Sequence, residues 1–557
     1  MARPVRLAFL GGLGRIGRNC ATIEVDGRLL IVDCGQMFPD ETEPGIDVIL
    51  PDFTYLREQA GRIDGCLLTH AHEDHIGALP YVLRDMSFPI YGAPFTLGLV
   101  RHKLDEAGLL NRAELIPIGD HQRRRIGSFD CEFLPVTHST PSSLLTVFRT
   151  PQGVIVHSGD FKIDPLPVDG RTTDVERVAA IAREEGVRLL LADSTNADSP
   201  GATKSETHIG DVLRGVFQAN RGRRIIVASF ASHVHRLQQV ADIAVEEGRK
   251  VVILGTSMVR NTKLARDIGL MHIPTTSIVP PDELEKLDPA RVCVICTGSQ
   301  GESRAVLWQL VIGENRYMSI AKDDTVVLSA HPIPGNESSV ARLRNRLTQL
   351  GATVVHDGIL EVHTSGHAKQ DELATLMRAA NPEWFVPIHG EVSHLAAHAQ
   401  LARQVLPLPE DHVVVCAEGD TLVLSDEGMT LGPEIPARRV YVHGTVDGVD
   451  DAVLRDRKTL GDDGFVAIAV DVHLDGRPRA GEPRVISRGW AAEHDRTMLH
   501  EAVADAVRRA LRDLFADPQD EGATREQVER AVRRAAGATV NERSRRRPMI
   551  VPVVTYN

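Results

Sequence analysis

The segment Leu68-Thr69-His70-Ala71-His72-Glu73-Asp74-His75-Ile76-Gly77 places three histidines and an aspartate within six positions, directly after the apolar run 63–68. In an extended segment, side chains two residues apart point the same way, so His70 and His72 can bind one ion together. Asp74 and His75 fall where the chain is expected to turn into a helix, and they can face a second ion. Two ions that share a water generate a hydroxide nucleophile at neutral pH. The alternative is a polar loop of solvated histidines.

The bulk composition restricts the class of protein. A chain of 557 residues exceeds what one hydrophobic core usually supports, so we expect more than one domain. With 42% hydrophobic and 25% charged residues, the composition is that of a soluble globular protein. A net charge of −13 argues against a surface that binds nucleic acid indiscriminately, although it allows a local basic channel. Aromatic residues make up only 4%, which disfavours recognition by base stacking.

The cysteines and the N-terminus indicate an intracellular protein. Seven cysteines, an odd number scattered through apolar runs, do not form a disulfide framework. Cys293 and Cys296 form a C-x-x-C within the apolar run 292–296, which predicts a buried strand; a zinc knuckle would need a second pair. The start of the chain lacks a long apolar signal region, and no stretch reaches the length of a membrane span. We therefore expect a cytoplasmic protein without membrane contact.

The rhythm of apolar runs predicts the domain organisation. The first part, 1–205, alternates short strands and turns, and several strands end in His, Asp or Ser, as when loops at a sheet edge carry functional groups. Residues 206–351 read as helix–strand units of a small parallel α/β domain, which is an insertion into the first if the histidines near 363–367 and 389 belong to the metal centre of that domain. We expect 352–445 to complete the first domain, 446–459 to be a linker, and 460–557 to form a compact α+β domain.

Three further segments have two interpretations each. Gly11 to Gly17 resembles a dinucleotide fingerprint, but a strand-like run follows instead of a helix, which predicts a backbone turn rather than a phosphate site. The basic cluster 543–547 is interpreted as a solvated or subunit-facing surface, with RNA contact as the alternative. The amphipathic helix 500–515 carries Val503, Val507, Leu511 and Leu514, which we expect in the core of its own domain rather than at an interface.

Four more strand ends supply ligand-type side chains. His138 follows the run 131–136, Asp160 follows 154–156, and His389 follows 385–388. Asp33, in Val32-Asp33-Cys34-Gly35, can orient a ligand histidine from behind it. The predicted centre uses His70, His72 and His138 for one ion, Asp74, His75 and His389 for the other, and Asp160 as the bridge.

These residues carry a family resemblance. The H-x-H-x-D-H segment with His138, Asp160 and His389 closely resembles the metallo-β-lactamase fold. Asp193, the segment 363–367 and Pro387-Ile388-His389 resemble its β-CASP branch of nucleases. The motifs that resemble bacterial ribonuclease J are Gly11-Gly12-Leu13-Gly14-x-Ile16-Gly17-x-Asn19, Gly159-Asp160-Phe161-Lys162-Ile163-Asp164, Asp193-Ser-Thr-Asn196, Thr297-Gly298-Ser299-Gln300-Gly301-Glu302 and Pro332-Ile333-Pro334-Gly335-Asn336-Glu337. The resemblance implies an αββα metallo-β-lactamase sandwich, an inserted parallel α/β β-CASP domain and a small α+β C-terminal domain.

The resemblance also implies roles for individual residues. Asp74, Asp193 and His367 would be catalytic: Asp193 would hold or orient a ligand histidine, and His367 would protonate the leaving 3′ oxygen. Substrate contacts would come from Ser232, His233, Ser329, His363, Thr364, Ser365, Gly366 and His367. For Ser232 and Ser365 the alternative is that they cap turns. His233 stands where the family pattern has asparagine and Arg15 where glutamate is common, and the first departure puts the details of 5′-end recognition in doubt.

The predicted activity follows from this resemblance. We expect a two-metal ribonuclease that leaves 5′-phosphate products and degrades single-stranded RNA from 5′-monophosphate ends, with endonuclease action as a further activity, in RNA maturation and decay. Two divalent ions per subunit are expected, zinc as the bound metal with manganese or magnesium supporting activity. A homodimer or tetramer and partners from the RNA-degradation machinery are implied. The rivals are a small-molecule metallohydrolase and a non-catalytic RNA-processing scaffold.

Overall fold

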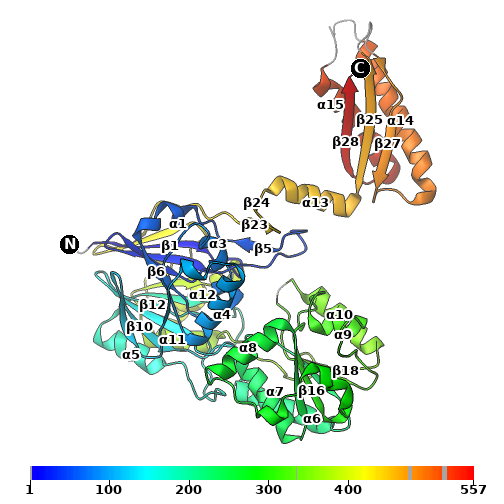
Figure 1. The fold of residues 1–557 in the computed structure, drawn as a ribbon. Helices are drawn as coiled ribbons and strands as arrows, with labels where there is room; N and C mark the ends of the chain where they lie inside the picture. Colours follow the sequence, from blue (N-terminus) through cyan, green and yellow to red (C-terminus); the bar gives the residue numbers. More distant parts are fainter. Residues whose placement is uncertain (1–2, 334, 474–478, 517–523, 557) are drawn as a thin grey trace. The chain divides into compact units, whose positions relative to one another are not determined.

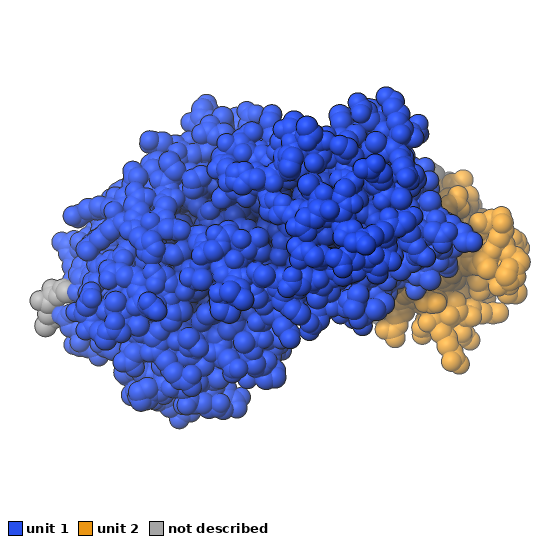
Figure 2. Space-filling model, turned by 90° about the horizontal axis from the view of Figure 1, so that it is seen from below, with its two compact units in different colours: residues 1–38, 48–440 blue, residues 39–47, 441–557 orange. Residues whose placement is uncertain are grey.

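The computed structural model describes residues 3–333, 335–473, 479–516 and 524–556 (Figure 1). The chain divides into two compact units, coloured separately in Figure 2. The first unit contains residues 1–38 and 48–440, and the second contains 39–47 and 441–557. Within the described residues, no helix combines the length and the apolar character needed to cross a membrane.

Two facing sheets form the sandwich of the first unit. The eight-stranded sheet has the order β22-β21-β1-β3-β4-β6-β7-β8, and the six-stranded sheet has the order β19-β13-β12-β11-β10-β9. The strands of the first sheet are β1 (Val5–Gly11), β3 (Cys20–Val25), β4 (Arg28–Val32), β6 (Ile63–Leu67), β7 (Ile90–Gly92), β8 (Leu115–Pro117), β21 (Thr421–Ser425) and β22 (Gly428–Leu431). Those of the second sheet are β9 (Arg123–Ile126), β10 (Phe129–Pro135), β11 (Leu144–Thr150), β12 (Gly153–His157), β13 (Val187–Asp193) and β19 (Trp384–Ile388).

The second sheet is buried on both faces, and its sequence shows why. Alternate residues of a strand point to opposite faces. Leu189 and Leu191 of β13 join the core between the two sheets, whereas Leu190 joins the core beneath the helices. The helices on that outer face are α5 (Val175–Glu184), α11 (Gln370–Ala380) and α12 (Val392–Val405). Because both faces of β13 are buried, its sequence must be a continuous apolar run. Helices cover one face of this sheet and the eight-stranded sheet covers the opposite face, as expected for the αββα sandwich.

The remaining short elements of the first unit lie before and between these strands. They are β2 (Leu13–Gly14), β5 (Val48–Leu50), α1 (Thr54–Glu58), α2 (Glu73–Ile76), α3 (Leu79–Val82), α4 (Pro94–Glu106) and β20 (Gly390–Glu391). The glycine-rich segment turns the chain out of β1, with positive φ angles at Gly12, Gly14 and Gly17. A backbone turn at this place is confirmed.

Residues between β13 and β19 contain the inserted domain, drawn in green in Figure 1. Its five strands are all parallel, in the order β15-β16-β14-β17-β18. The strands are β14 (Ile225–Ala228), β15 (Lys250–Leu254), β16 (Val292–Cys296), β17 (Thr325–Leu328) and β18 (Thr353–His356). The helices are α6 (Glu206–Ala219), α7 (Val234–Glu246), α8 (Thr256–Asp267), α9 (Val306–Ile312) and α10 (Glu337–Gln349). Cys293 and Cys296 are buried in β16, so the predicted buried strand is confirmed.

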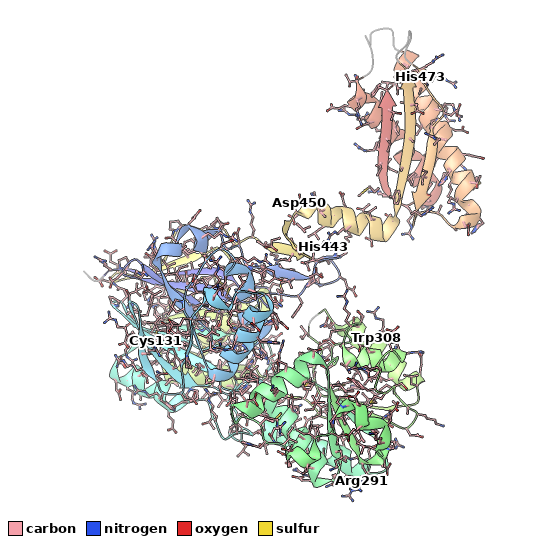
Figure 3. All side chains as sticks on the ribbon, in the orientation of Figure 1. Cys131, Arg291, Trp308, His443, Asp450 and His473 are labelled. Atoms are coloured by element: carbon pink, nitrogen blue, oxygen red, sulfur yellow. The ribbon has the colours of Figure 1, made fainter. Side chains whose placement is uncertain are left out.

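In Figure 3, Cys131 marks the sandwich, whereas Trp308 and Arg291 mark the inserted domain. The insertion ends where the chain rejoins the sandwich, because β19 pairs in parallel with β13 and places Ile388 beside Asp193. Residues 195 positions apart in the chain are thereby brought to one sheet edge.

Buried charges connect the inserted domain to the sandwich. Lys162, which follows β12, is fully buried, and its Nζ lies 3.4 Å from Asp164 and 3.8 Å from Glu206. Glu206 begins α6 and accepts a hydrogen bond from Arg236 of α7, which is also fully buried. Charged groups are stable in such surroundings only when they are paired, so each member of this cluster depends on the others.

Loss of the Glu206 carboxylate is expected to destabilise the first unit strongly, because Arg236 would be left as an uncompensated buried cation and Lys162 would keep only Asp164. We expect Glu206→Ala to lower the free energy of unfolding by about 3–5 kcal/mol, measured by urea denaturation. The control is Glu361→Ala, which removes an exposed partner of His208 and should cost less than about 1 kcal/mol. Equal effects of the two substitutions would contradict the role of the buried cluster.

The second unit is an α+β domain preceded by a hairpin and a helix. Its elements are β23 (Val440–His443), β24 (Val446–Val449), α13 (Asp451–Asp463), β25 (Phe465–His473), β26 (Arg479–Ala480), β27 (Arg484–Arg488), α14 (Glu493–Ala516), α15 (Arg525–Ser544) and β28 (Met549–Tyr556). His443, Asp450 and His473 mark successive parts of it in Figure 3. The expected linker 446–459 contains β24 and most of α13, which Asp450 caps by accepting a hydrogen bond from the Val453 N–H.

The core of this domain lies between its sheet and its two long helices. Alternate residues of β25, beginning with Val466, pack against α14 and α15. On α14, Val503, Val507 and Leu511 are buried and Leu514 packs against them. The sequence prediction that these four residues belong to the core of their own domain is therefore confirmed.

Candidate metal centre

The histidine motif spans the end of one strand and the start of a helix. It follows β6, and His70 and His72 lie in the irregular segment that leaves the sheet. His72 has extended backbone angles (φ −73°, ψ 152°) and directly precedes α2, whose first turn carries Asp74 and His75. The predicted change from extended chain to helix within the motif is confirmed. Gly35 permits the close approach this requires, because a Cβ there would lie 1.5 Å from the Asp74 carbonyl oxygen.

The other candidate ligands come from the second sheet. Asp193 ends β13, whereas His138, Asp160 and His389 lie just beyond the ends of β10, β12 and β19. Since β12, β13 and β19 run parallel, their carboxyl ends meet at one edge of the sheet. His389 has a positive φ of 53°, a conformation costly for a residue with a Cβ and typical of functional sites.

The structure brings together all seven metal ligands predicted from the sequence. Three overlapping clusters have ligand atoms within 4.8 Å of one another: His70, His72, His138 and Asp160; Asp74, His75, Asp160 and His389; and Asp160, Asp193, His367 and His389. The first two are the two predicted ion sites, and Asp160 belongs to both. The arrangement therefore has the composition of two neighbouring nitrogen and oxygen donor sets that share one carboxylate.

One carboxylate oxygen of Asp160, Oδ2, lies near several histidine nitrogens but forms no hydrogen bond among the described residues. Asp160 Oδ2 is buried and makes no hydrogen bond with any described residue. It lies 3.2 Å from His75 Nε2, 3.4 Å from His70 Nε2 and 3.9 Å from His138 Nε2. A buried carboxylate oxygen surrounded by ring nitrogens is suited to a cation held between them.

The protonation preferences fit this interpretation. Burial lowers the pKa of His72 to about 4 and that of His70 well below its usual value, so both rings are neutral and can offer a lone pair to a metal at neutral pH. Burial also opposes a charge on His75 and His389, but Asp160 and the neighbouring carboxylates raise the pKa of His389 to about 10. Carboxylates that favour a protonated ring in this way also favour a bound cation.

Residues behind the ligands fix their orientation. Asp33 Oδ2 lies 2.8 Å from His75 Nδ1 and also accepts a hydrogen bond from the Thr69 hydroxyl. This is the position expected for Asp33 from the sequence. Asn19, at the end of the glycine-rich motif, lies 3.0 Å from His75 Nε2 and donates to Asp74 Oδ2. The glycine-rich motif contains Asn19 but indicates no role for it, because a contact across 55 residues cannot be derived from local spacing.

Asp193 connects His367 with His389. Its Oδ2 lies 2.7 Å from His367 Nδ1, and its Oδ1 lies 3.2 Å from His389 Nδ1. The Thr195 hydroxyl also lies 2.7 Å from His389 Nδ1 and donates to Asp193, and no pattern in the sequence predicts these two contacts. One carboxylate therefore orients a candidate ligand and the candidate proton donor.

The loop 363–367 is attached to the sandwich. Asn196 Nδ2 donates to Ser365 Oγ (2.8 Å) and to the His367 carbonyl oxygen (2.9 Å). At Gly366 a Cβ would approach the His138 ring to 2.9 Å. Thr364 donates its hydroxyl to the Lys204 carbonyl oxygen. Ser365 and Gly366 thus lie beside the centre, whereas the Thr364 hydroxyl is used within the protein.

The substrate residues proposed in the inserted domain lie in different surroundings. Ser232 is partly exposed, but His233 is 1% exposed and its Nε2 lies 3.3 Å from Glu206. Ser329 is fully buried and donates to the Val362 carbonyl oxygen. His363 is partly buried, and its Nδ1 has no hydrogen-bond partner among the described residues. His233 and Ser329 thus contribute to the buried polar cluster between domains.

Comparison with protein families agrees with the fold and the centre. Residues 13–181 match the metallo-beta-lactamase superfamily, and residues 335–413 match the Zn-dependent metallo-hydrolase RNA specificity domain. The fold and the shared histidine–aspartate centre thus define a metal-dependent hydrolase of the metallo-beta-lactamase class. Residues 222–347 and 452–557 match the ribonuclease J beta-CASP domain and the ribonuclease J C-terminal domain. The chain belongs to the ribonuclease J family and is a metal-dependent ribonuclease.

Individual relatives span nearly the whole chain. It is 40% identical to ribonuclease J of Mycolicibacterium smegmatis, covering 99% of this chain and 97% of the relative. It is 36% identical to ribonuclease J 1 of Streptococcus pyogenes, with coverage of 98% and 96%. A solved structure of an Enterococcus faecalis protein of unknown function is similar with a TM-score of 0.53 and 17% identity, over 76% of this chain and 100% of that one. That likeness concerns the fold alone.

Asn196 is expected to act by positioning the loop 365–367. We expect Asn196→Ala to lower kcat for RNA cleavage about 10–100-fold, the usual effect of removing a group that orients a site, while the metal content stays unchanged. Cleavage kinetics and elemental analysis measure the two quantities. Asn345→Ala, on the exposed face of α10, is the control and should change neither. Unaltered kinetics of Asn196→Ala would show that the loop does not depend on this contact.

Proposed function

We propose that the chain is a two-metal ribonuclease that degrades single-stranded RNA from the 5′ end and leaves 5′-phosphate products. The observation that carries the proposal is the sharing of Asp160 between two ligand clusters, with His367 at their edge. Two-ion sites of this kind suit the displacement at phosphorus in a phosphodiester. The matched RNA specificity domain supports RNA as the substrate class.

The residues present fit two divalent cations. His70, His72, His138 and Asp160 would hold one, and Asp74, His75, Asp160 and His389 the other. When bound, such ions supply Lewis acidity toward the phosphoryl oxygens and lower the pKa of water. Imidazole and carboxylate donors together suit zinc and also manganese, and magnesium remains a candidate for supporting activity.

His367 is proposed to protonate the leaving 3′ oxygen. Its Nδ1 is engaged by Asp193, which leaves Nε2 for a proton transfer to substrate. Burial would lower the pKa of His367, but the Asp193 carboxylate outweighs it and raises this pKa above its usual value. The ring can therefore carry a proton at neutral pH, as a general acid must. Asp193 would in addition stabilise the charged ring during the reaction.

Ser365 and the backbone at Gly366 are proposed to contact the phosphate next to the scissile bond. Both lie on the loop that carries His367, and Asn196 holds this loop beside the centre. For the 5′-monophosphate we propose the region of Ser232 and His363, since both residues are partly exposed and the buried Nδ1 of His363 has no hydrogen-bond partner among the described residues. His233 would act there indirectly, through Glu206.

The direction of degradation tests the proposal. The substrate is one RNA labelled at its 5′-monophosphate end in one sample and at its 3′ end in another, in manganese or magnesium. We expect immediate release of labelled mononucleotide from the 5′ label, without short 3′-labelled fragments. Discrete internal fragments would show that the enzyme is chiefly an endonuclease. Absence of cleavage with either metal would contradict the ribonuclease assignment.

A matched pair of variants extends this experiment to His367. His367→Ala should cleave about 10²–10⁴-fold more slowly, the usual contribution of a general acid, with its RNA affinity retained. His208→Ala removes an exposed histidine of α6 and should cleave at the wild-type rate. A His367→Ala variant with the wild-type rate would exclude this residue as the proton donor.

A further inference from the structure

Helix α15 and the loop after it form a basic segment in an acidic chain. Residues 525–547 contain eight arginines and three glutamates, a net charge of +5, whereas the whole chain carries −13. The segment belongs to the second unit, outside the metal centre. A local concentration of one charge in a chain of the opposite net charge indicates an interaction surface.

The helix turns one row of small and basic residues away from its core. Its buried face consists of Val528, Val532, Ala536 and Val540. Arg530, Arg534, Gly537 and Asn541 follow the spacing i, i+4, i+7 and i+11, so they lie in a row on the opposite face. Both arginines and Asn541 are exposed. The row from Arg530 to Asn541 rises about 16 Å at 1.5 Å per residue.

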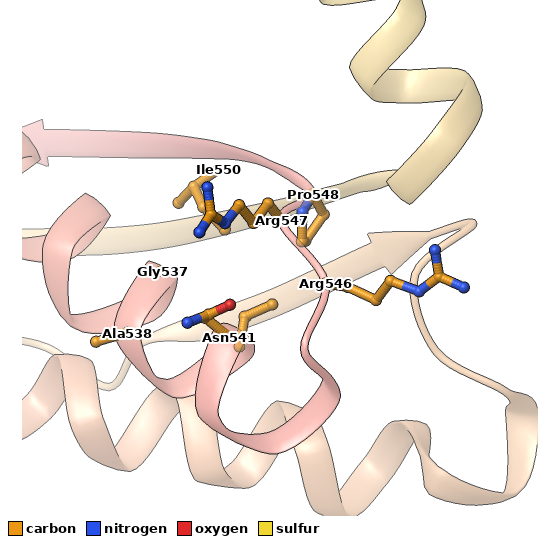
Figure 4. Close-up of a pocket in the computed structure, with 8 residues that line it drawn as sticks. Gly537, Ala538, Asn541, Arg546, Arg547, Pro548 and Ile550 are labelled. Carbon is orange, nitrogen blue, oxygen red and sulfur yellow. The ribbon is translucent and has the colours of Figure 1, made fainter.

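A pocket continues this row at the C-terminal end of the helix (Figure 4). It has a volume of about 320 Å³ and is lined by Gly537, Ala538, Val540, Asn541, Arg546, Arg547, Pro548 and Ile550. A Cβ placed on Gly537 would meet nothing within 4 Å, so the absence of a side chain there leaves this part of the pocket open. Figure 4 shows Arg546 and Arg547 extending from the loop in opposite directions.

Most of these arginines lack an acidic partner. In the part of the chain that the structure describes, Arg525 pairs with Glu529 and Arg546 lies 3.4 Å from Asp463. Six others form no ion pair through their guanidinium groups with a carboxylate of the described residues, namely Arg530, Arg533, Arg534, Arg543, Arg545 and Arg547. The backbone N–H of Arg547 donates to Asp463 Oδ2 (3.2 Å), which leaves its guanidinium group unpaired. Like charges at i and i+4, as at Arg530 and Arg534, destabilise a helix. A bound polyanion would offset this repulsion.

We propose that the strip formed by Arg530, Arg534, Gly537, Asn541, Arg546 and Arg547 binds the phosphate backbone of RNA, at a site separate from the metal centre. This inference rests on RNA being the substrate class. Arginine presents a planar set of donors that matches two oxygens of one phosphate. No aromatic side chain lines the pocket. We therefore expect the strip to contact phosphates rather than to stack on bases, so that binding does not depend on the RNA sequence.

The first test measures the affinity of the metal-loaded full chain for RNA. The probe is a fluorescent single-stranded 30-nucleotide RNA with phosphorothioate linkages, which slow its hydrolysis. Arg534→Gln combined with Arg547→Gln should raise Kd about tenfold at 0.1 M salt and lower the slope of log Kd against log salt by about 1.4, at 0.7 per phosphate contact. The matched control, Arg509→Gln with Arg512→Gln, removes the same charge from exposed positions on α14 and should leave Kd within about twofold.

A second pair of variants tests the pocket without removing an arginine. Gly537→Gln and Gly537→Glu add side chains of the same size at an open helical position. The glutamate should raise Kd several-fold more than the glutamine, because only its charge repels phosphate. Equal Kd values for this pair, together with an unchanged Kd for Arg534→Gln/Arg547→Gln, would overturn the proposal.

Two other outcomes separate the alternatives. If the arginine variant changes the sedimentation mass of the protein while its RNA affinity stays unchanged, the strip is a subunit contact and the proposal is overturned. If the wild-type chain cleaves no RNA in manganese or magnesium, the proposed function fails as well. If the wild-type chain cleaves RNA and the variants bind RNA with unchanged affinity, the proposed function stands and only the RNA-binding role of the strip is overturned.

Discussion

The carboxylate of Asp160 is the group on which the rest of the centre depends. It is 2% exposed, and its Oδ2 lies within 4 Å of nitrogens from four histidines. Burial alone would raise the pKa of Asp160, but His389 and His75 hold it well below its usual value. A buried anion of this kind is stable only with cations around it. Protonated rings or metal ions can meet this requirement, and the neutral rings of His70 and His72 favour metal.

This requirement explains why the fold must bring so many strand ends together. Asp160 follows β12, Asp193 ends β13 and His389 follows β19, three neighbouring parallel strands. The inserted domain lies between β13 and β19, so the centre is complete only after the chain has passed through it and returned. The buried cluster of Lys162, Glu206 and Arg236 connects the insertion to the sandwich close to the same strand ends.

Local patterns in the sequence predicted the strands, the α/β insertion and the seven candidate ligands, whereas the αββα sandwich was expected from the family resemblance. Apolar runs predict buried strands, and a histidine or aspartate at the end of such a run marks the sheet edge. Asn196 and Thr195 escaped prediction because their contacts with Ser365 and His389 join distant parts of the chain. For the same reason the sequence could not reveal that His233 is buried and lies beside Glu206.

The C-terminal domain shows another limit of sequence reasoning. The spacing of Val503, Val507 and Leu511 correctly predicted its core, because burial of one helix face leaves a periodic pattern. The expected linker 446–459 is instead largely structured, since short polar sequences give no apolar period even where Asp450 caps a helix. Exposed arginines form no apolar period either. The row from Arg530 to Asn541 on α15 can therefore be recognised only once the buried face of that helix is known.

The most direct test of the shared carboxylate is the number of metal ions that each variant retains. The wild-type chain, His72→Ala and Asp160→Asn would be loaded with zinc or manganese, passed through gel filtration and examined by elemental analysis. We expect two ions per chain in the wild type, about one in His72→Ala, and fewer than one in Asp160→Asn, because Asp160 belongs to both clusters and His72 to one. Retention of two ions by Asp160→Asn, or a single ion in the wild type, would contradict a centre built on this carboxylate.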